Sequence, residues 1–218
     1  KQGDTDKEIY TLGRLLDASN IDSEPTYGLH YDMTVPMARY VAANLSQLVF
    51  PFKRYQIQKA WRGERPQDGR FREFLQCDID VVDTREIPLH FDVEIPTIMH
   101  QAINAIQAGP ISTKINNRKI LEGYYSGLGV HNTATAIRII DKIDKIGVNG
   151  VTDLLSKELA LNFKTIDKII QLAQIRGSGH EVATQVQALG VTSELLEHGL
   201  TELTFVMQEL QKVDREAF

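Results

Sequence analysis

A cluster of arginine and lysine side chains lies between residues 53 and 72, where the sequence predicts two antiparallel strands joined by a turn. Over residues 53–73, seven cations and only three carboxylates give a local charge of +4, in a chain whose net charge is -5. The cations are Lys53, Arg54, Lys59, Arg62, Arg65, Arg70 and Arg72, and the carboxylates are Glu64, Asp68 and Glu73. A planar guanidinium pairs with two oxygen atoms at once. The hairpin therefore indicates a phosphate or carboxylate site, although a solvated basic surface has the same composition.

Arg62 is the strongest candidate for an anion ligand, because it follows Trp61 where the hydrophobic run ends. Arg65, Arg70 and Arg72 lie around the turn and can close over a ligand from the loop. On the second strand, alternation of side chains separates two sets of residues. One face carries Phe74, Gln76, Asp78 and Asp80, and the other, which we expect to be buried, carries Leu75, Cys77, Ile79 and Val81.

A second polar group, Asp32 and Thr34, precedes the hairpin. If these residues alternate on a strand edge, they face the same way and can bind an ammonium group. The same residues also fit the start of a helix, with a capping side chain and Pro36 in the first turn. Both interpretations remain open from the residues alone.

Two sequence blocks carry a family resemblance. Residues 61–67 (WRGERPQ) and 69–74 (GRFREF) resemble motif 2 of class II aminoacyl-tRNA synthetases, in the form found in histidyl-tRNA synthetases. Residues 29–40 (LHYDMTVPMARY) are similar to a second segment of that family, and the resemblance extends over residues 3–218. It implies an α+β fold, in which residues 1–118 form part of the class II antiparallel sheet with flanking helices. Residues 119–218 would form an all-helical insertion domain.

The resemblance also implies an activity and a set of site residues. Histidine and ATP would give histidyl-adenylate and pyrophosphate, and the histidyl group would pass to tRNA(His). The implied catalytic residue is Arg62, which would bridge the α-phosphate and the histidine carboxylate. The implied histidine-binding residues are Asp32, Met33, Thr34, Arg62, Gln76 and Asp80, with Asp80 receiving the imidazole; those for ATP are Arg62, Glu64 and Arg70. Mg²⁺ would sit on the phosphates, and no metal-ligating residues are predicted.

The family pattern is incomplete here. Motif 1, the R-G-L-D-Y-Y segment and the motif 3 arginine are absent, so we expect an internal part of a longer homodimeric synthetase with little activity of its own. The start has no signal-peptide pattern and no apolar run has membrane-spanning length, which favours a cytoplasmic protein. The single cysteine, Cys77, excludes an internal disulfide, and the scattered histidines lack ligand-like spacing.

Several elements must position these residues. Before residue 118 we expect helices over 6–16 and 35–45, a helix capped by Asp92 with Pro96 in its first turn, and a strand over 111–115. Beyond it, apolar stripes at helical spacing predict helices with one buried face. The stripes are Ala136, Ile139, Ile140 and Ile143; Phe163, Ile166, Ile169, Ile170 and Ala173; and Leu196, Leu200, Leu203 and Leu210. Glycines near residues 127, 147, 177 and 190 should separate the helices.

Two other functions compete with a synthetase. One is a histidine-sensing regulatory subunit of ATP phosphoribosyltransferase, which is also similar to the synthetases but tends to lack the motif 2 arginines and the helical insertion. The other is a non-enzymatic helical binding module, which leaves the basic hairpin unexplained. Residues 119–218 carry 10 Lys and Arg against 13 Asp and Glu, so their charge does not predict a tRNA surface. Contact with tRNA by this segment is implied by the resemblance only.

Overall fold

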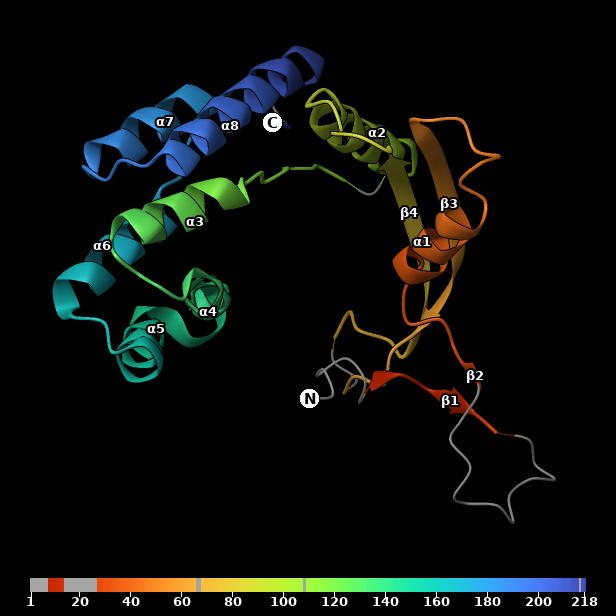
Figure 1. The fold of residues 1–218 in the computed structure, drawn as a ribbon, viewed down its shortest axis with the longest axis horizontal. Helices are drawn as coiled ribbons and strands as arrows, with labels where there is room; N and C mark the ends of the chain where they lie inside the picture. Colours follow the sequence, from red (N-terminus) through yellow and green to blue (C-terminus); the bar gives the residue numbers. More distant parts are fainter. Residues whose placement is uncertain (1–7, 14–26, 66–67, 108, 216) are drawn as a thin grey trace. The chain divides into compact units, whose positions relative to one another are not determined.

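The computed structural model describes residues 8–13, 27–65, 68–107, 109–215 and 217–218. The chain divides into two compact units, Lys1–Ile87 and Pro88–Phe218. Figure 1 shows strands in the first unit and helices throughout the second. The fold is thus a mixture of helices and small antiparallel sheets, as the α+β prediction requires.

The first unit is built around a long hairpin. Its elements in chain order are β1 (Thr11–Leu12), β2 (Tyr27–Gly28), α1 (Thr34–Ala43), β3 (Phe52–Trp61) and β4 (Glu73–Val82). Strand β1 pairs with β2, and β3 pairs with β4, both antiparallel. The β3–β4 register runs without a bulge from Phe52 opposite Val82 to Trp61 opposite Glu73. The predicted hairpin is therefore confirmed, and its turn falls at the glycine-containing segment between Arg62 and Arg72.

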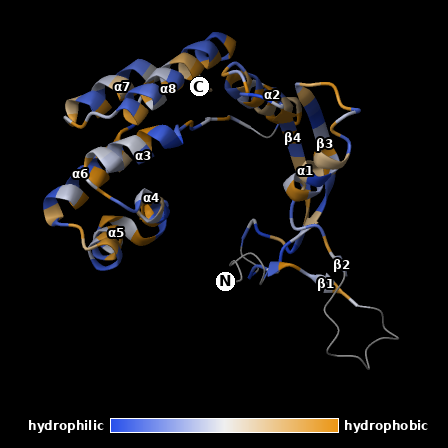
Figure 2. Ribbon diagram, viewed as in Figure 1, coloured by the Kyte–Doolittle hydropathy of each residue, from blue (hydrophilic) through white to orange (hydrophobic). Residues whose placement is uncertain are grey.

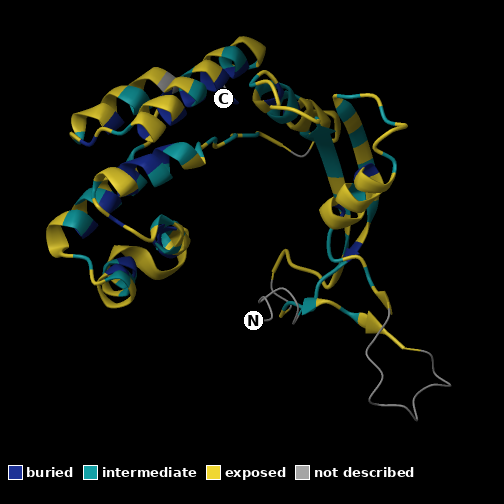
Figure 3. Cartoon of the chain, viewed as in Figure 1, coloured by how far each residue is buried: buried dark blue, intermediate teal, exposed yellow. Residues whose placement is uncertain are grey.

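The two faces of the hairpin differ from the prediction. Alternation along β4 is present, but the apolar face is the open one: Leu75 is 68% exposed and Cys77 is an exposed free thiol. The polar face is better covered, because residues 30–33 hydrogen-bond to its side chains. The expectation that this apolar face is buried is wrong: Leu75 and Cys77 are exposed, and Ile79 and Val81 are only half-buried. Exposed and half-buried residues alternate along β3 and over Glu73–Cys77 of β4, while the remainder of β4 is half-buried (Figure 3).

The predicted helix over residues 6–16 is wrong where the structure describes it, since Thr11–Leu12 forms a strand. Thr11 has a β-branched side chain suited to a strand, and Gly13 weakens a helix at this point. The remainder of that predicted helix, residues 6–7 and 14–16, lies outside the described residues. The helix predicted over 35–45 is confirmed as α1.

The second unit is helical. Its elements are α2 (Phe91–Ala105), α3 (Arg118–Gly127), α4 (Thr133–Ile140), α5 (Ile143–Leu159), α6 (Phe163–Gln174), α7 (Gly179–Ala188) and α8 (Glu194–Val213). Figure 2 shows apolar and polar residues alternating along these helices. The predicted stripes are largely buried, with Ile139, Ile169 and Leu196 among the fully enclosed core residues. Phe163 is an exception, because it is the first residue of α6 and is 78% exposed.

Helices α3 and α8 approach each other most closely at two glycines. A Cβ atom on Gly123 would collide with the backbone nitrogen of Leu196, and one on Gly199 would lie 2.8 Å from the backbone nitrogen of Ile120. The absence of side chains at these positions lets the two backbones pack directly. Ser193 fixes the same junction, since its hydroxyl donates to the Gly123 carbonyl at 3.0 Å.

Three predictions about this unit need correction. Helix α2 begins at Phe91 with His90 as its N-cap residue, so Asp92 lies inside the first turn and does not cap the helix. Pro96 is the sixth residue of α2, beyond its first turn. The segment over 111–115 is not a strand; its backbone instead bonds to the C-terminal residues, where Thr113 N donates to Ala217 O at 2.9 Å. This segment has no neighbouring strand in the described unit with which to pair.

The helix breaks predicted near residues 127, 177 and 190 are confirmed, and the one predicted at Gly147 is a kink within a single helix. Helix α3 ends at Gly127, Ser178 caps α7, and Gly190 follows α7 with a φ of 70°. Gly147 bends the chain inside α5, with φ 72° and ψ 173°. The two compact units meet between Ile87 and Pro88. The domain boundary predicted at residue 118 stays a prediction. No helix among the described residues is long and apolar enough to cross a membrane.

Candidate active site

Arg62 lies at the end of β3, between two aromatic rings. Its guanidinium carbon is 4.9 Å from the centre of the Tyr31 ring and 5.2 Å from that of Phe74. The backbone continues the strand pairing here, because Arg62 N donates to Arg72 O at 2.9 Å. Contacts of a guanidinium with aromatic faces are attractive and hold the group's plane in place. The side chain that the sequence ranked first among the cations is therefore the most firmly held one near the turn.

Hydrogen bonds orient the same guanidinium toward β4. Arg62 Nε donates to Tyr31 O and Nη2 donates to Gln76 Oε1, each at 3.3 Å. Gln76 in turn donates through Nε2 to Asp78 Oδ1 at 3.0 Å. The structure thus brings together Arg62 and Gln76, two of the predicted site residues, on the covered face of the hairpin. Both hydrogen bonds of Arg62 are long, and both acceptors are neutral. These bonds therefore compensate only part of the positive charge of the guanidinium.

Glu8 braces this arrangement from the N-terminal segment. It accepts a hydrogen bond from Tyr31 Oη through Oε2 at 3.1 Å and one from Gly63 N through its carbonyl at 2.7 Å. Burial raises the pKa of Tyr31, and the hydrogen bond to Glu8 and the charge of Glu8 raise it further. Tyr31 therefore stays a neutral donor at neutral pH, and its ring stays against Arg62.

The loop residues predicted to bind ATP contact each other. Arg70 Nη1 lies 2.8 Å from Glu64 Oε2, and Arg72 Nε donates to the Glu64 carbonyl at 3.3 Å. The Arg70 side chain is 63% exposed and that of Glu64 26% exposed. An exposed pair of this kind contributes little to stability, typically about 0–1 kcal/mol, so Arg70 can exchange Glu64 for a ligand anion at small cost. Arg65 is also exposed.

The segment with Asp32, Met33 and Thr34 forms the start of α1. Asp32 Oδ1 accepts a hydrogen bond from Val35 N at 3.1 Å, and Thr34 is the first helical residue. The helix-start interpretation is therefore correct, and the strand-edge interpretation is wrong. Met33 is fully buried, while Asp32 is half-buried and Thr34 is exposed. The two polar residues do not share a strand face: Thr34 is the first residue of the helix, Met33 is its N-cap residue, and Asp32 before it accepts the hydrogen bond from Val35 N.

Asp80 stands directly opposite Arg54 across the hairpin. Arg54 Nη2 lies 2.8 Å from Asp80 Oδ2, and the two side chains are 11% and 21% exposed. The contact has ion-pair distance without good hydrogen-bond alignment, so Oδ2 is a buried oxygen that accepts no well-aligned hydrogen bond among the described residues. Asp80 is thus a covered, paired carboxylate and not an exposed strand-end one.

The predicted residues do not all meet at one point. Gln76 and Asp80 are four positions apart on β4, which corresponds to about 13 Å along an extended strand. Arg62 and Gln76 lie toward the turn, and Asp80 lies toward the open end of the hairpin. Sequence reasoning counted Arg54 among the cations but gave it no role. Arg54 and Arg62 are eight positions apart, and because side chains alternate along a strand, this even spacing could have placed both on one face of the hairpin.

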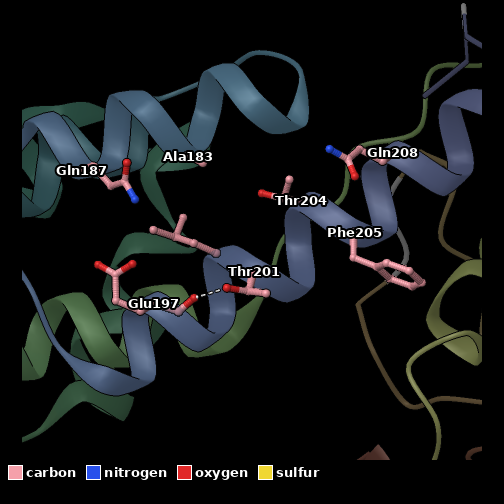
Figure 4. Close-up of a pocket in the computed structure, with 8 residues that line it drawn as sticks. Ala183, Gln187, Glu197, Thr201, Thr204, Phe205 and Gln208 are labelled. Carbon is pink, nitrogen blue, oxygen red and sulfur yellow. Dashed lines mark hydrogen bonds between the residues drawn. The ribbon is translucent and has the colours of Figure 1, made fainter.

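A separate hollow of about 370 Å³ lies in the helical unit between α7 and α8. Figure 4 shows Gln187 on α7 and Glu197, Thr201 and Phe205 on α8 around it. None of the predicted site residues lines this hollow. In the described parts of the chain, no group of three or more His, Cys, Asp or Glu side chains could hold a metal ion.

The sequence of this chain is similar to those of one known protein family. A family model described as Histidyl-tRNA synthetase matches residues 4–218. The histidine–tRNA ligase of Thermobifida fusca is 49% identical over 209 residues, which cover 96% of this chain and 48% of that protein. The corresponding protein of Micrococcus luteus is 43% identical, with 97% and 48% covered. The chain therefore spans about half the length of the curated relatives that it matches.

Solved structures agree on the fold. The crystal structure of histidyl-tRNA synthetase from Nostoc sp. PCC 7120 matches with a TM-score of 0.79 at 35% identity, covering 94% of this chain and 45% of that one. A structure from Bacillus halodurans, described as an ATP phosphoribosyltransferase regulatory subunit/histidyl-tRNA synthetase, matches with a TM-score of 0.75 at 19% identity. The second match covers 97% of this chain and 51% of that one, and it shows a shared fold only.

Proposed function

This chain belongs to the histidyl-tRNA synthetase family, and we propose that the complete protein activates histidine with ATP and transfers it to tRNA(His). The observation that carries this proposal is the position of Arg62. It is held between the Tyr31 and Phe74 rings and hydrogen-bonded to Gln76, on the covered face of the hairpin. A fixed cation at this place can neutralise charge that develops during transfer of an adenylyl group.

In the proposed activation step, a histidine carboxylate oxygen attacks the α-phosphorus of ATP. A new oxygen–phosphorus bond forms, the bond to the bridging oxygen breaks, and pyrophosphate leaves with that electron pair. Arg62 would contact both the carboxylate and the α-phosphate, which are like-charged and repel each other in its absence. Its contribution is to hold the two anions in line and to stabilise the charge on the phosphorus oxygens.

ATP would lie over the turn half of the hairpin. Glu64 and Arg70 belong to the loop, and their exposed mutual ion pair leaves both able to turn toward a nucleotide, Glu64 at the adenine end and Arg70 at the γ-phosphate. Magnesium would arrive with the triphosphate and reduce its charge. The loop fits this role because it offers guanidinium groups that few carboxylates neutralise.

Histidine would lie between Arg62 and the open end of the hairpin. Gln76 and Asp32 offer oxygen acceptors for the α-ammonium group, with Thr34 beside Asp32 at the start of α1. Asp80 would accept a hydrogen bond from the imidazole through its covered carboxylate. Met33 is buried, so its contribution is to support this segment through packing and its backbone carbonyl.

We further propose that β3 and β4 belong to the class II antiparallel sheet and that residues 119–218 form the insertion domain, which would contact tRNA. We also propose that the complete protein is a homodimer located in the cytoplasm. The support for these assignments is the family membership and the fold match to the Nostoc structure.

Histidine-dependent exchange of labelled pyrophosphate into ATP tests the proposed function. The complete polypeptide carrying this chain should catalyse exchange with histidine and not with other amino acids. Binding of histidine by calorimetry without any exchange would contradict the proposal and favour the regulatory-subunit alternative, which the Bacillus halodurans match keeps relevant at the level of fold.

A further inference from the structure

Arg54 contacts three acceptors from separate parts of the first unit. Its guanidinium lies 2.8 Å from Asp80 Oδ2 on β4, donates to Met33 O at 3.1 Å and donates to Gln56 Oε1 at 2.6 Å. The side chain is only 11% exposed. A lysine ammonium also has three donors, but they share one nitrogen, whereas Arg54 reaches these acceptors from two nitrogens, Nη1 and Nη2, of a rigid planar group.

These contacts connect two segments of the proposed histidine site. Asp80 is the proposed acceptor for the imidazole, and Met33 lies between Asp32 and Thr34, which are proposed to bind the α-ammonium group. We propose that Arg54 is a positioning residue for histidine selection: it fixes the Asp80 carboxylate and ties it to the 32–34 segment. This inference rests on the proposed function and adds to it a residue that would not itself touch the substrate.

The geometry of Asp80 supports this role. Its Oδ2 atom is buried beside Arg54, yet it accepts no well-aligned hydrogen bond among the described residues. A buried carboxylate oxygen without an aligned donor is costly unless a further donor satisfies it. Arg54 thus balances the charge of Asp80 at Oδ2, and the substrate ring would have to meet the carboxylate on the side that Arg54 does not cover.

Arg54 also sets the direction of a chain of hydrogen bonds along β3. A guanidinium only donates, so Gln56 must accept through Oε1 and present its amide nitrogen onward. Gln56 Nε2 donates to Gln58 Oε1 at 2.5 Å, and Gln58 Nε2 lies 3.2 Å from His30 Nδ1. His30 therefore accepts at Nδ1. The hydrogen bonds on the polar face therefore all run in one direction, from Arg54 beside Asp80 to His30, which lies two residues before Asp32.

Four variants of the complete polypeptide test the inference: Arg54→Gln, Arg54→Lys, Asp80→Asn and the double variant Arg54→Gln/Asp80→Asn. Lys59→Gln is the matched control, because Lys59 is a cation of the same strand that is exposed on the opposite face. Pyrophosphate exchange gives the KM values for histidine and for ATP. A second substrate, thiazol-4-ylalanine, replaces the ring N–H of histidine by sulfur and reports on recognition of that donor.

The expected result for Arg54→Gln is a rise in the histidine KM of about tenfold or more, with the ATP KM unchanged and the preference for histidine over the thiazole analogue reduced. Arg54→Lys should recover part of this preference, and the double variant should be no worse than Asp80→Asn alone. Equal effects on both substrates, or behaviour like Lys59→Gln, would overturn the inference while leaving the proposed function intact. Absence of exchange by the unmodified polypeptide would overturn the proposed function, and the inference with it.

Discussion

At the residue scale, the position of Arg62 depends on neighbours from two other segments, the one that contains Tyr31 and strand β4. Tyr31 and Phe74 flank its guanidinium, and Gln76 accepts its hydrogen bond. Arg62 stands out in the sequence because it follows Trp61 at the end of the hydrophobic run, and Gln76 is predicted from the family resemblance. The sequence could not identify Tyr31 or Glu8, since their contact with Arg62 and Gly63 depends on how the N-terminal segment returns to the hairpin.

Arg70→Ala should raise the KM for ATP in pyrophosphate exchange by about tenfold, because it removes the guanidinium proposed to meet the γ-phosphate. The free energy of unfolding should change by less than about 0.5 kcal/mol, since the pair with Glu64 is exposed. Steady-state exchange kinetics and urea unfolding of the complete polypeptide measure the two quantities. An unchanged ATP KM would remove Arg70 from the proposed nucleotide site; Arg118→Ala, which breaks an exposed pair with Glu122, is the control.

At the element scale, the helical unit follows its sequence closely, while the first unit departs from it. Apolar stripes with helical spacing predict buried faces because each helix in this unit has neighbours on that side. The β4 strand has an equally clear apolar face, but the segment at residues 30–33 covers the polar one. Alternation determines which residues share a face, and only tertiary contacts determine which face is covered.

The α3–α8 junction yields a stability prediction. Gly123→Ala should lower the free energy of unfolding by about 1–3 kcal/mol, because the new Cβ would collide with the backbone of Leu196. In an exposed helix the same change would be stabilising, by about 1 kcal/mol. Ser126→Ala, an exposed position on the same helix, is the control and should change stability by less than about 0.5 kcal/mol. Chemical denaturation followed by circular dichroism measures both, and a more stable Gly123→Ala variant would contradict this packing.

The same junction should respond to acid through Glu202. Burial alone would raise the pKa of Glu202, but hydrogen bonds from Lys119 and Asn117 outweigh it and the pKa is lowered. A carboxyl whose pKa is lower in the folded state contributes stability above its unfolded pKa, and the contribution is lost as pH falls through the folded pKa.

The difference in unfolding free energy between the unmodified protein and Glu202→Gln should therefore be positive at about pH 7 and shrink below about pH 4. Urea unfolding at several pH values measures it. Glu209→Gln, which removes a more exposed partner of Lys212, should show a smaller dependence on pH. A pH-independent difference for Glu202 would show that its contacts with α3 do not depend on its charge.

At the scale of the whole molecule, the proposed substrate-binding residues and the large helical core belong to different compact units. The residues proposed to act on histidine and ATP all lie in Lys1–Ile87, and the large buried core lies in Pro88–Phe218. The motif 2 pattern carried the family assignment from sequence because its residues are adjacent in the chain. The position of Asp80 beside Arg54 required the strand register, which joins residues 26 positions apart.

The measurement that tests the central claim most directly is histidine-dependent pyrophosphate exchange by the complete polypeptide, with Arg62→Ala and Lys59→Gln compared side by side. Arg62→Ala should lower kcat by about 100-fold or more, since it removes a cation fixed where charge develops. Lys59→Gln should retain nearly full exchange, because Lys59 lies on the exposed face and pairs with Glu73. Exchange that persists undiminished in Arg62→Ala would contradict the assignment of Arg62 to the reacting groups.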